Sequence, residues 1–456
     1  MKLKMSKEVD LGKEPIGHLL FVLAVPSIIS QVVNALYNMV DRMYIGHIPG
    51  EGAAALTGLG VCFPIIMIVS AFAALMGMGG APRASILMGK KDNEGAEKIL
   101  GNCFSALVIT AVVLTALVLV FKRPLLMMFG ASENTIGYAE SYLNIYAVGT
   151  IFVQLTLGLN AFIAAQGFSK ISMMTVVIGA VTNIVLDPIF IFALGMGVKG
   201  AALATVLSQT VGAVWILRFL TGKKTILRLK RSNMHLDPKV FGPCLALGIS
   251  TFVMLSTESL LSISFTSSLS RFGGDVAVGA MTIITSISQL VTLPLQGICQ
   301  GGQPIISYNF GANKPDRVKK AFFTQFCTCV IYTTAFWLVV MIFPKAFATI
   351  FTSDKELVTY SAWALRIYMA GIFSLGFQVS CQQSFMALGQ AKVSLLLACL
   401  RKIVLLIPLI FILPNFFDNK VFAVFLAEPV SDIIAATVTT ITFFTLFNSI
   451  LKKEKR

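Results

Sequence analysis

The chain has 456 residues, of which 56% are hydrophobic and only 12% are charged. Soluble globular domains contain about 25% charged residues, so this composition excludes an ordinary soluble protein and indicates an integral membrane protein. The formal net charge is +15, which in a membrane protein reflects topology and does not require a nucleic-acid partner.

Twelve apolar segments are long enough to cross about 30 Å of hydrocarbon as helices. They are expected at residues 16–41, 54–78, 100–121, 139–165, 171–194, 200–220, 240–265, 277–299, 322–343, 359–387, 394–414 and 421–447. The start of the chain is charged and has no short apolar stretch followed by a cleavage site, so we expect a cytoplasmic tail.

Lys and Arg are distributed unevenly along this pattern. Most of the 36 basic residues lie in the termini and the even-numbered connections, which places both ends in the cytoplasm. Arg401 and Lys402 are expected at the cytoplasmic entry of the eleventh span. Arg366, in the tenth, is then the sole basic residue well inside a span.

The first span carries a polar stripe. Gln31, Asn34, Asn38 and Asp41 recur every three or four residues on one helical face, beside Tyr37. Lipid cannot face such a stripe, so it predicts a watered cavity. For any single residue, the alternative is a hydrogen bond between helices.

The fifth span contains the sequence Asn-Ile-Val-Leu-Asp-Pro, from Asn183 to Pro188. Asn183 and Asp187 are four residues apart and share one helical face. Insertion of an ionisable group into the membrane at such a position costs roughly 2.5 to 3.5 kcal/mol, and such a group usually marks an ion or substrate pathway. Pro188 is expected to bend the helix and leave a carbonyl free beside the acid. The alternative is a structural aspartate that bonds a neighbouring helix.

Depth along the helices brings four polar residues together. At about 1.5 Å per residue, Asn183 and Asp187 lie in the outer half of the membrane, near the level of Thr205 and of Asp41. Two carboxylates held close in a low dielectric cannot both stay ionised cheaply. Either one binds a proton, or both coordinate a cation such as Na⁺.

An internal repeat organises the whole chain. Gly79-Gly80-x-Pro82 follows the second span, and Gly301-Gly302-x-Pro304 follows the eighth, 222 residues later. Each repeat holds six spans, so the halves should be related by a pseudo-twofold axis along the membrane normal, with binding between them. We therefore predict an all-α membrane protein with a bundle at 1–220 that holds the cation site, a basic cytoplasmic linker at 221–238, and a second bundle at 239–456.

Taken together, these motifs resemble the multidrug and toxic compound extrusion (MATE) antiporters, most closely their MepA-like branch, over essentially the whole chain. The residues that carry the resemblance are Pro26, Tyr37-Asn38-x-x-Asp41, the two Gly-Gly-x-Pro elements, and Asn183-x-x-x-Asp187-Pro188 with Thr205. The resemblance implies export of cationic amphipathic compounds in exchange for H⁺ or Na⁺. It also implies a cation site at Asp41, Asn183, Asp187 and Thr205, and a first helix that bends at Pro26.

Polar residues of both halves are expected to line the substrate cavity: Gln31, Asn34, Tyr37, Asn38, Asn160, Glu258, Gln289, Gln296 and Gln378. Another branch of the family uses acids in the seventh and tenth spans. This chain keeps Glu258 but has no acid in its tenth span, which argues against a second cation site there. Whether Glu258, Glu428 and Asp432 couple ions or anchor helices is left open.

With this resemblance, we expect a multidrug efflux antiporter that works by alternating access in the membrane of a bacterial or archaeal cell. It is expected to be a monomer in the lipid bilayer that binds small organic cations. We expect no cofactor and no structural metal, although Na⁺ could bind at Asp41, Asn183 and Asp187. One alternative is a flippase for lipid-linked oligosaccharides, which would need a cationic cavity for pyrophosphate. A membrane enzyme is disfavoured because neither His-Glu-x-x-His nor a Walker loop is present, and a channel because no filter loop repeats.

Overall fold

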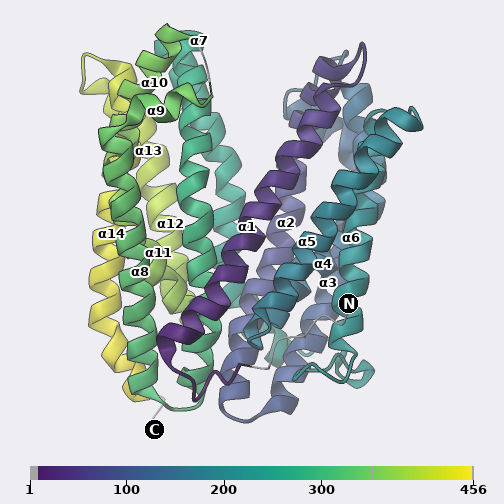
Figure 1. Ribbon diagram of the computed structural model, residues 1–456, viewed down its shortest axis with the longest axis vertical. Coiled ribbons are helices and arrows are strands. Elements are labelled where there is room, and N and C mark those ends of the chain that lie inside the picture. The colour runs from purple at the N-terminus through teal and green to yellow at the C-terminus, as the bar shows by residue number, and fades with distance from the viewer. Residues whose placement is uncertain (1–8, 352–353, 454–456) are drawn as a thin grey trace. The chain divides into compact units, whose positions relative to one another are not determined.

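The computed structural model describes residues 9–351 and 354–453. The prediction of an all-helical protein with twelve spans is confirmed (Figure 1). The helices are α1 Ile16–Gly46, α2 Gly52–Gly89, α3 Asn93–Met128, α4 Ile136–Ala165, α5 Ser169–Pro188, α6 Val198–Leu220, α7 Pro238–Gly311, α8 Pro315–Ile342, α9 Pro344–Thr349, α10 Lys355–Tyr368, α11 Leu375–Ala387, α12 Ala391–Cys399, α13 Ile407–Ile412 and α14 Lys420–Lys453.

Several spans depart from a regular α-helix. Gly274, with φ +63° and ψ −158°, divides α7 into two spans, Pro238–Gly274 and Val276–Gly311. The tenth span contains a 3₁₀ segment between α10 and α11. Beyond Pro188, α5 continues as a π-helical turn at Ile189–Ala193, and a second π-helical turn, Leu400–Leu406, joins α12 to α13. Such turns are rare and often accompany functional sites.

Contacts divide the chain into two units. Unit 1 consists of residues 29–252 and the described residues before Glu14, and unit 2 consists of residues 14–28 and the described residues from Val253 onward. Each unit has its own apolar core. The first part of α1 thus belongs to unit 2, and the first part of α7 belongs to unit 1. The domain limits drawn from the sequence stay a prediction.

Glycines explain how these exchanged segments pack. In unit 1, Gly79 of α2 and Gly248 of α7 each face the backbone of the other helix. In unit 2, Gly297 and Gly301 face the backbone of the first part of α1. A side-chain carbon at any of the four would overlap that backbone. Small residues of this kind let membrane helices approach closely.

The basic linker is held against unit 1 and is not a freely solvated connection. Gln166 accepts hydrogen bonds from the hydroxyl of Thr225 at 2.8 Å and from the next two backbone N–H groups at 2.9 Å. Glu97 forms an ion pair with Lys230 at 2.5 Å. Leu227 is fully buried.

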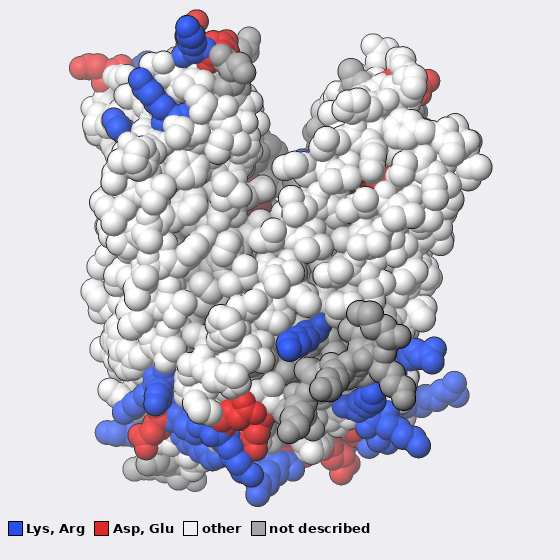
Figure 2. Space-filling model, viewed as in Figure 1, with Lys and Arg blue, Asp and Glu red and all other residues white. Residues whose placement is uncertain are grey.

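Charge is segregated within each unit. Most of the Lys and Arg side chains in view gather at the lower end, a smaller group lies at the upper end, and few lie along the middle of the helices (Figure 2). This pattern agrees with the bias from which a cytoplasmic location of both termini was predicted.

Candidate ion-coupling site

The four residues predicted to bind the coupling cation lie together inside unit 1. Asp41 comes from the end of α1, Asn183 and Asp187 from the last turns of α5, and Thr205 from the second turn of α6. All four are buried, with exposed fractions of 9% or less. The Asn183 amide donates a hydrogen bond to Oδ1 of Asp187 at 3.3 Å. The side chains of Asp41 and Asp187 are close enough to hydrogen-bond to each other.

Two carboxyl groups this close cannot both stay ionised cheaply in a low dielectric. A hydrogen bond between them forms only when one of them carries a proton. Oδ1 of Asp41, Oδ1 of Asn183 and Oδ2 of Asp187 are buried, and none accepts a hydrogen bond from a donor in the described part of the chain. Buried oxygens without donors are costly. The site therefore suits a proton or a small hard cation such as Na⁺.

An aromatic wall beside this site was missed by the sequence analysis. Tyr142 and Tyr146 of α4 are buried, and their rings stack with centroids 6.0 Å apart. The Tyr142 hydroxyl lies close to Thr205, and Tyr37 lies near both carboxyl groups. The signal was present in the sequence, because two tyrosines four residues apart place two hydroxyl groups on one face of an apolar helix.

The residues predicted to line a substrate cavity are divided between the two units. Unit 1 holds Gln31, Asn34, Tyr37, Asn38 and Asn160, and unit 2 holds Glu258, Gln289, Gln296 and Gln378. Asn34, Asn38, Glu258, Gln289 and Gln296 are exposed, whereas Gln378 is only 2% exposed and lies inside unit 2. A cavity that uses both sets stays a prediction.

Pro26 lies inside α1, close to the point where this helix passes from one unit to the other. The boundary falls between Ile28 and Ile29, two residues after the proline. That α1 bends at Pro26 stays a prediction.

Arg401 and Lys402 show that one prediction was wrong. Arg366 lies eleven residues after the start of the tenth span at Lys355, toward one end of that span, whereas Arg401 and Lys402 lie well inside the eleventh span and not at its entry. Both residues belong to the π-helical turn Leu400–Leu406, about 15 Å beyond the start of α12. Lys402 is 5% exposed, and the Arg401 side chain is 15% exposed.

Three acids face these buried cations. Arg401 bonds Asp432 at 2.8 Å and Glu428 at 3.4 Å. Lys402 forms an ion pair with Glu258 and donates to a backbone carbonyl of α7 at 3.0 Å. Buried charges persist only when they are paired in this way. The structure thus pairs Glu258, Glu428 and Asp432 with buried cations, and whether they also couple ions stays open.

Comparison with known proteins gives a family. The MatE family model matches residues 26–189 and 250–412. The Multidrug export protein MepA of Staphylococcus haemolyticus (strain JCSC1435) is 24% identical over 414 residues, 90% of each chain. MepA of Staphylococcus aureus (strain N315) is 24% identical over 409 residues, 89% of each chain.

Solved structures share the fold. The outward-facing conformation of a multidrug resistance MATE family transporter matches with a TM-score of 0.90 at 23% identity, over 98% of this chain and 99% of that one. A crystal structure of MATE in the bent conformation matches with a TM-score of 0.92 at 23% identity, over 99% and 100%. Since the family model covers most of the sequence in both halves, the chain belongs to the MatE family of membrane transporters.

Proposed function

We propose that this chain is a secondary active antiporter that exports cationic, amphipathic compounds, antibiotics among them, in exchange for H⁺ or Na⁺. The observation that carries the proposal is the pairing of Asp41 with Asp187 inside unit 1, where buried oxygens lack donors. Ionisable groups buried in membrane spans mark ion pathways. Similarity to multidrug export proteins supports the class of substrate.

In the proposed cycle, the cation acts on the contact between α1 and α5. H⁺ or Na⁺ enters from outside and neutralises Asp41 and Asp187, which removes the repulsion between two like charges in a low dielectric. The outer part of α1 then approaches α5. Asp41 lies fifteen residues after Pro26, about 22 Å along the helix, so a small change of bend at the proline is amplified at the acid.

The driving force is sufficient for export against a gradient. Exchange of one H⁺ or Na⁺ for one monovalent organic cation moves no net charge, so the concentration gradient of the ion drives it, and a tenfold gradient supports about a tenfold ratio of the exported compound. A second ion per cycle would carry one net charge across the membrane, and a potential of 100 mV would then add about 2.3 kcal/mol, roughly a further 50-fold. Acidic groups and Tyr37 would favour a cationic, aromatic-binding substrate through charge and cation–π attraction.

A lipid-linked oligosaccharide flippase is the alternative function. Such a protein would need an uncompensated cationic surface within the membrane to hold pyrophosphate. Arg401 and Lys402 do lie inside a span, but Glu258, Glu428 and Asp432 face them. These two cations are therefore neutralised within unit 2, and the antiporter remains the better-supported function.

The decisive experiment is ethidium transport by proteoliposomes under a pH gradient or a Na⁺ gradient, each imposed alone. Asp187→Asn is compared with wild type and with Asp418→Asn, which removes an equivalent charge from an exposed connection. We expect one gradient to drive transport by wild type and by the control, and neither gradient to drive Asp187→Asn. Full transport by Asp187→Asn would contradict the coupling role of this residue. If wild type moves no dye under either gradient, the antiporter proposal fails and the flippase should be tested.

A further inference from the structure

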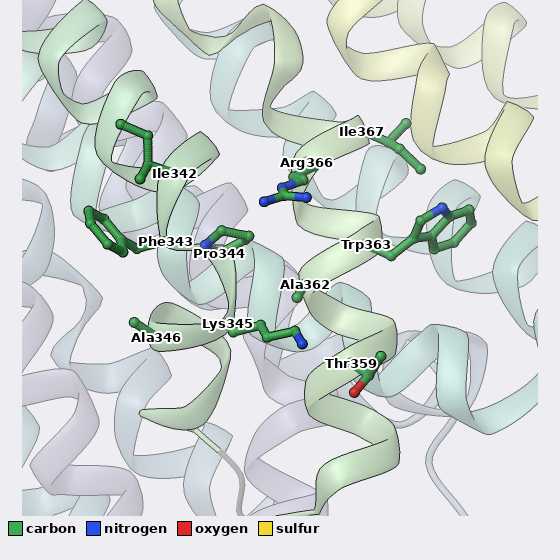
Figure 3. A pocket seen from close by; sticks show the side chains of 10 residues that line it. All are labelled: Ile342, Phe343, Pro344, Lys345, Ala346, Thr359, Ala362, Trp363, Arg366 and Ile367. Atoms are coloured by element: carbon green, nitrogen blue, oxygen red, sulfur yellow. The ribbon is translucent and has the colours of Figure 1, made fainter.

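A pocket of about 470 Å³ opens on the surface of unit 2, apart from the candidate ion-coupling site. Its walls come from the end of α8, from the short helix α9 and from α10 (Figure 3). The side chains that define its character are those of Lys345, Arg366, Thr359, Trp363, Phe343 and Ile342.

Two cations share this pocket without a counter-ion. The side chains of Lys345 and Arg366 extend into it from opposite walls (Figure 3). Neither forms an ion pair with any residue that the structure describes, and none of the described residues that line the pocket is acidic. The positive-inside bias does not account for them, because this side of the membrane is predicted to be poor in basic residues.

Helix lengths place the pocket at a membrane surface. Arg366 lies 21 residues before Ala387, where the tenth span ends, or about 32 Å along the helix axis. Ile342 lies 21 residues after Ala321, the residue that follows the basic start of α8, and so at a similar height. The hydrocarbon layer is about 30 Å thick. Both walls therefore reach the headgroup level of the leaflet predicted to face outward, where Trp363 fits the aromatic belt.

We propose that this pocket binds the phosphate of an anionic membrane phospholipid, such as phosphatidylglycerol. The forked Arg366 guanidinium matches phosphate oxygens, and Lys345 adds a second positive charge. Ile342 and Phe343 are 61% and 58% exposed. They give the rim an apolar surface for acyl chains, which a free phosphate ion would not use. The inference does not depend on the transported compound.

Trp363 allows a direct measurement, since the chain contains only three tryptophans. In a chain carrying Trp215→Phe and Trp337→Phe, all tryptophan fluorescence comes from Trp363, which lines the pocket. The protein is placed in nanodiscs with bromine-labelled acyl chains on either phosphatidylglycerol or phosphatidylcholine, at equal mole fraction. We expect stronger quenching by phosphatidylglycerol. Each of the two basic residues should contribute about a fivefold preference for this lipid over phosphatidylcholine.

Substitutions identify the groups responsible. In this background, the pair Lys345→Gln and Arg366→Gln should abolish the preference, whereas Arg366→Lys should keep part of it because the charge remains. Lys355→Gln is the matched control, since this exposed residue lies nearby in α10 but does not line the pocket. It should leave the preference unchanged.

Three results would overturn the proposal. The first is equal quenching by the two lipids in the parent chain. The second is a preference that survives the double glutamine substitution. The third is loss of the preference on addition of inorganic phosphate, which would identify a site for free anions. Arg366→Lys keeps the test valid should the double variant fail to fold.

Discussion

Replacing Arg401 with methionine should strongly destabilise unit 2, because it strands two buried acids. The Glu428 and Asp432 side chains are 12% and 4% exposed, and Arg401 is their ion-pair partner. Removal of one member of a buried pair costs about 3 to 5 kcal/mol. Lys402→Met, in the same turn, is the matched control. This substitution leaves Glu258 without its ion-pair partner, but the Glu258 side chain is 58% exposed to solvent. The expected loss of stability is therefore below about 1 kcal/mol.

These free energies convert to a measurable difference in Tm. One kcal/mol shifts Tm by about 2 to 4 °C for a cooperative unit of 150–250 residues, and unit 2 contains about 220. Arg401→Met should thus lower Tm by about 6 to 20 °C, and Lys402→Met by at most about 4 °C. A thiol-reactive dye can follow unfolding in detergent, because six of the eight cysteines are buried.

A compensated variant separates lost charge pairing from lost packing. Arg401→Met combined with Glu428→Gln and Asp432→Asn leaves no stranded charge, so most of the stability should return. Equal losses for Arg401→Met and Lys402→Met would refute the argument from burial. Failure of the triple variant to recover would show that Arg401 acts mainly through packing.

Three further predictions follow from the contacts of unit 1. Asp41→Asn should abolish cation-coupled efflux as fully as Asp187→Asn does, because the two acids act as one unit. Efflux that persists in only one of the two variants would indicate independent roles. Gln166→Ala removes three hydrogen bonds that hold the linker, so trypsin should cleave the linker about tenfold faster or more. An unchanged cleavage rate would mean that other contacts hold the linker. Gly79→Ala should lower Tm because its new carbon overlaps the α7 backbone, whereas Gly60→Ala meets open space and should be neutral or stabilising by up to about 1 kcal/mol. Equal Tm values for the two variants would contradict the close packing.

Local features of the sequence were enough to predict the twelve spans and to bring four polar residues to one level. The length of an apolar segment and the spacing of Asn183 and Asp187 are local properties. The rise per residue of a helix is constant, so the depths of Asp41 and Thr205 could also be worked out. Their proximity in the structure agrees with that expectation, and their role in ion coupling stays a proposal.

The rest depended on tertiary structure. A hydropathy pattern assigns Arg401 and Lys402 to the nearest helix end, because an isolated charge is cheaper there. The two cations can be buried only because α7 and α14 place acids beside them. No local sequence pattern indicates that pairing. The exchange of helix segments between units was missed for a similar reason, since the glycines that permit it also occur in ordinary helix contacts.

That exchange of segments constrains how the protein is made. Residues 14–28 leave the ribosome early, yet they pack against Gly297 and Gly301, which are synthesised roughly 270 residues later. At about 5 to 20 residues per second, the nascent segment waits roughly 15 to 50 s for its partner. A half-length chain that ends at the linker would lack the part of α7 that packs on Gly79. The two repeats are therefore not independent domains, and neither half of the gene encodes a complete unit.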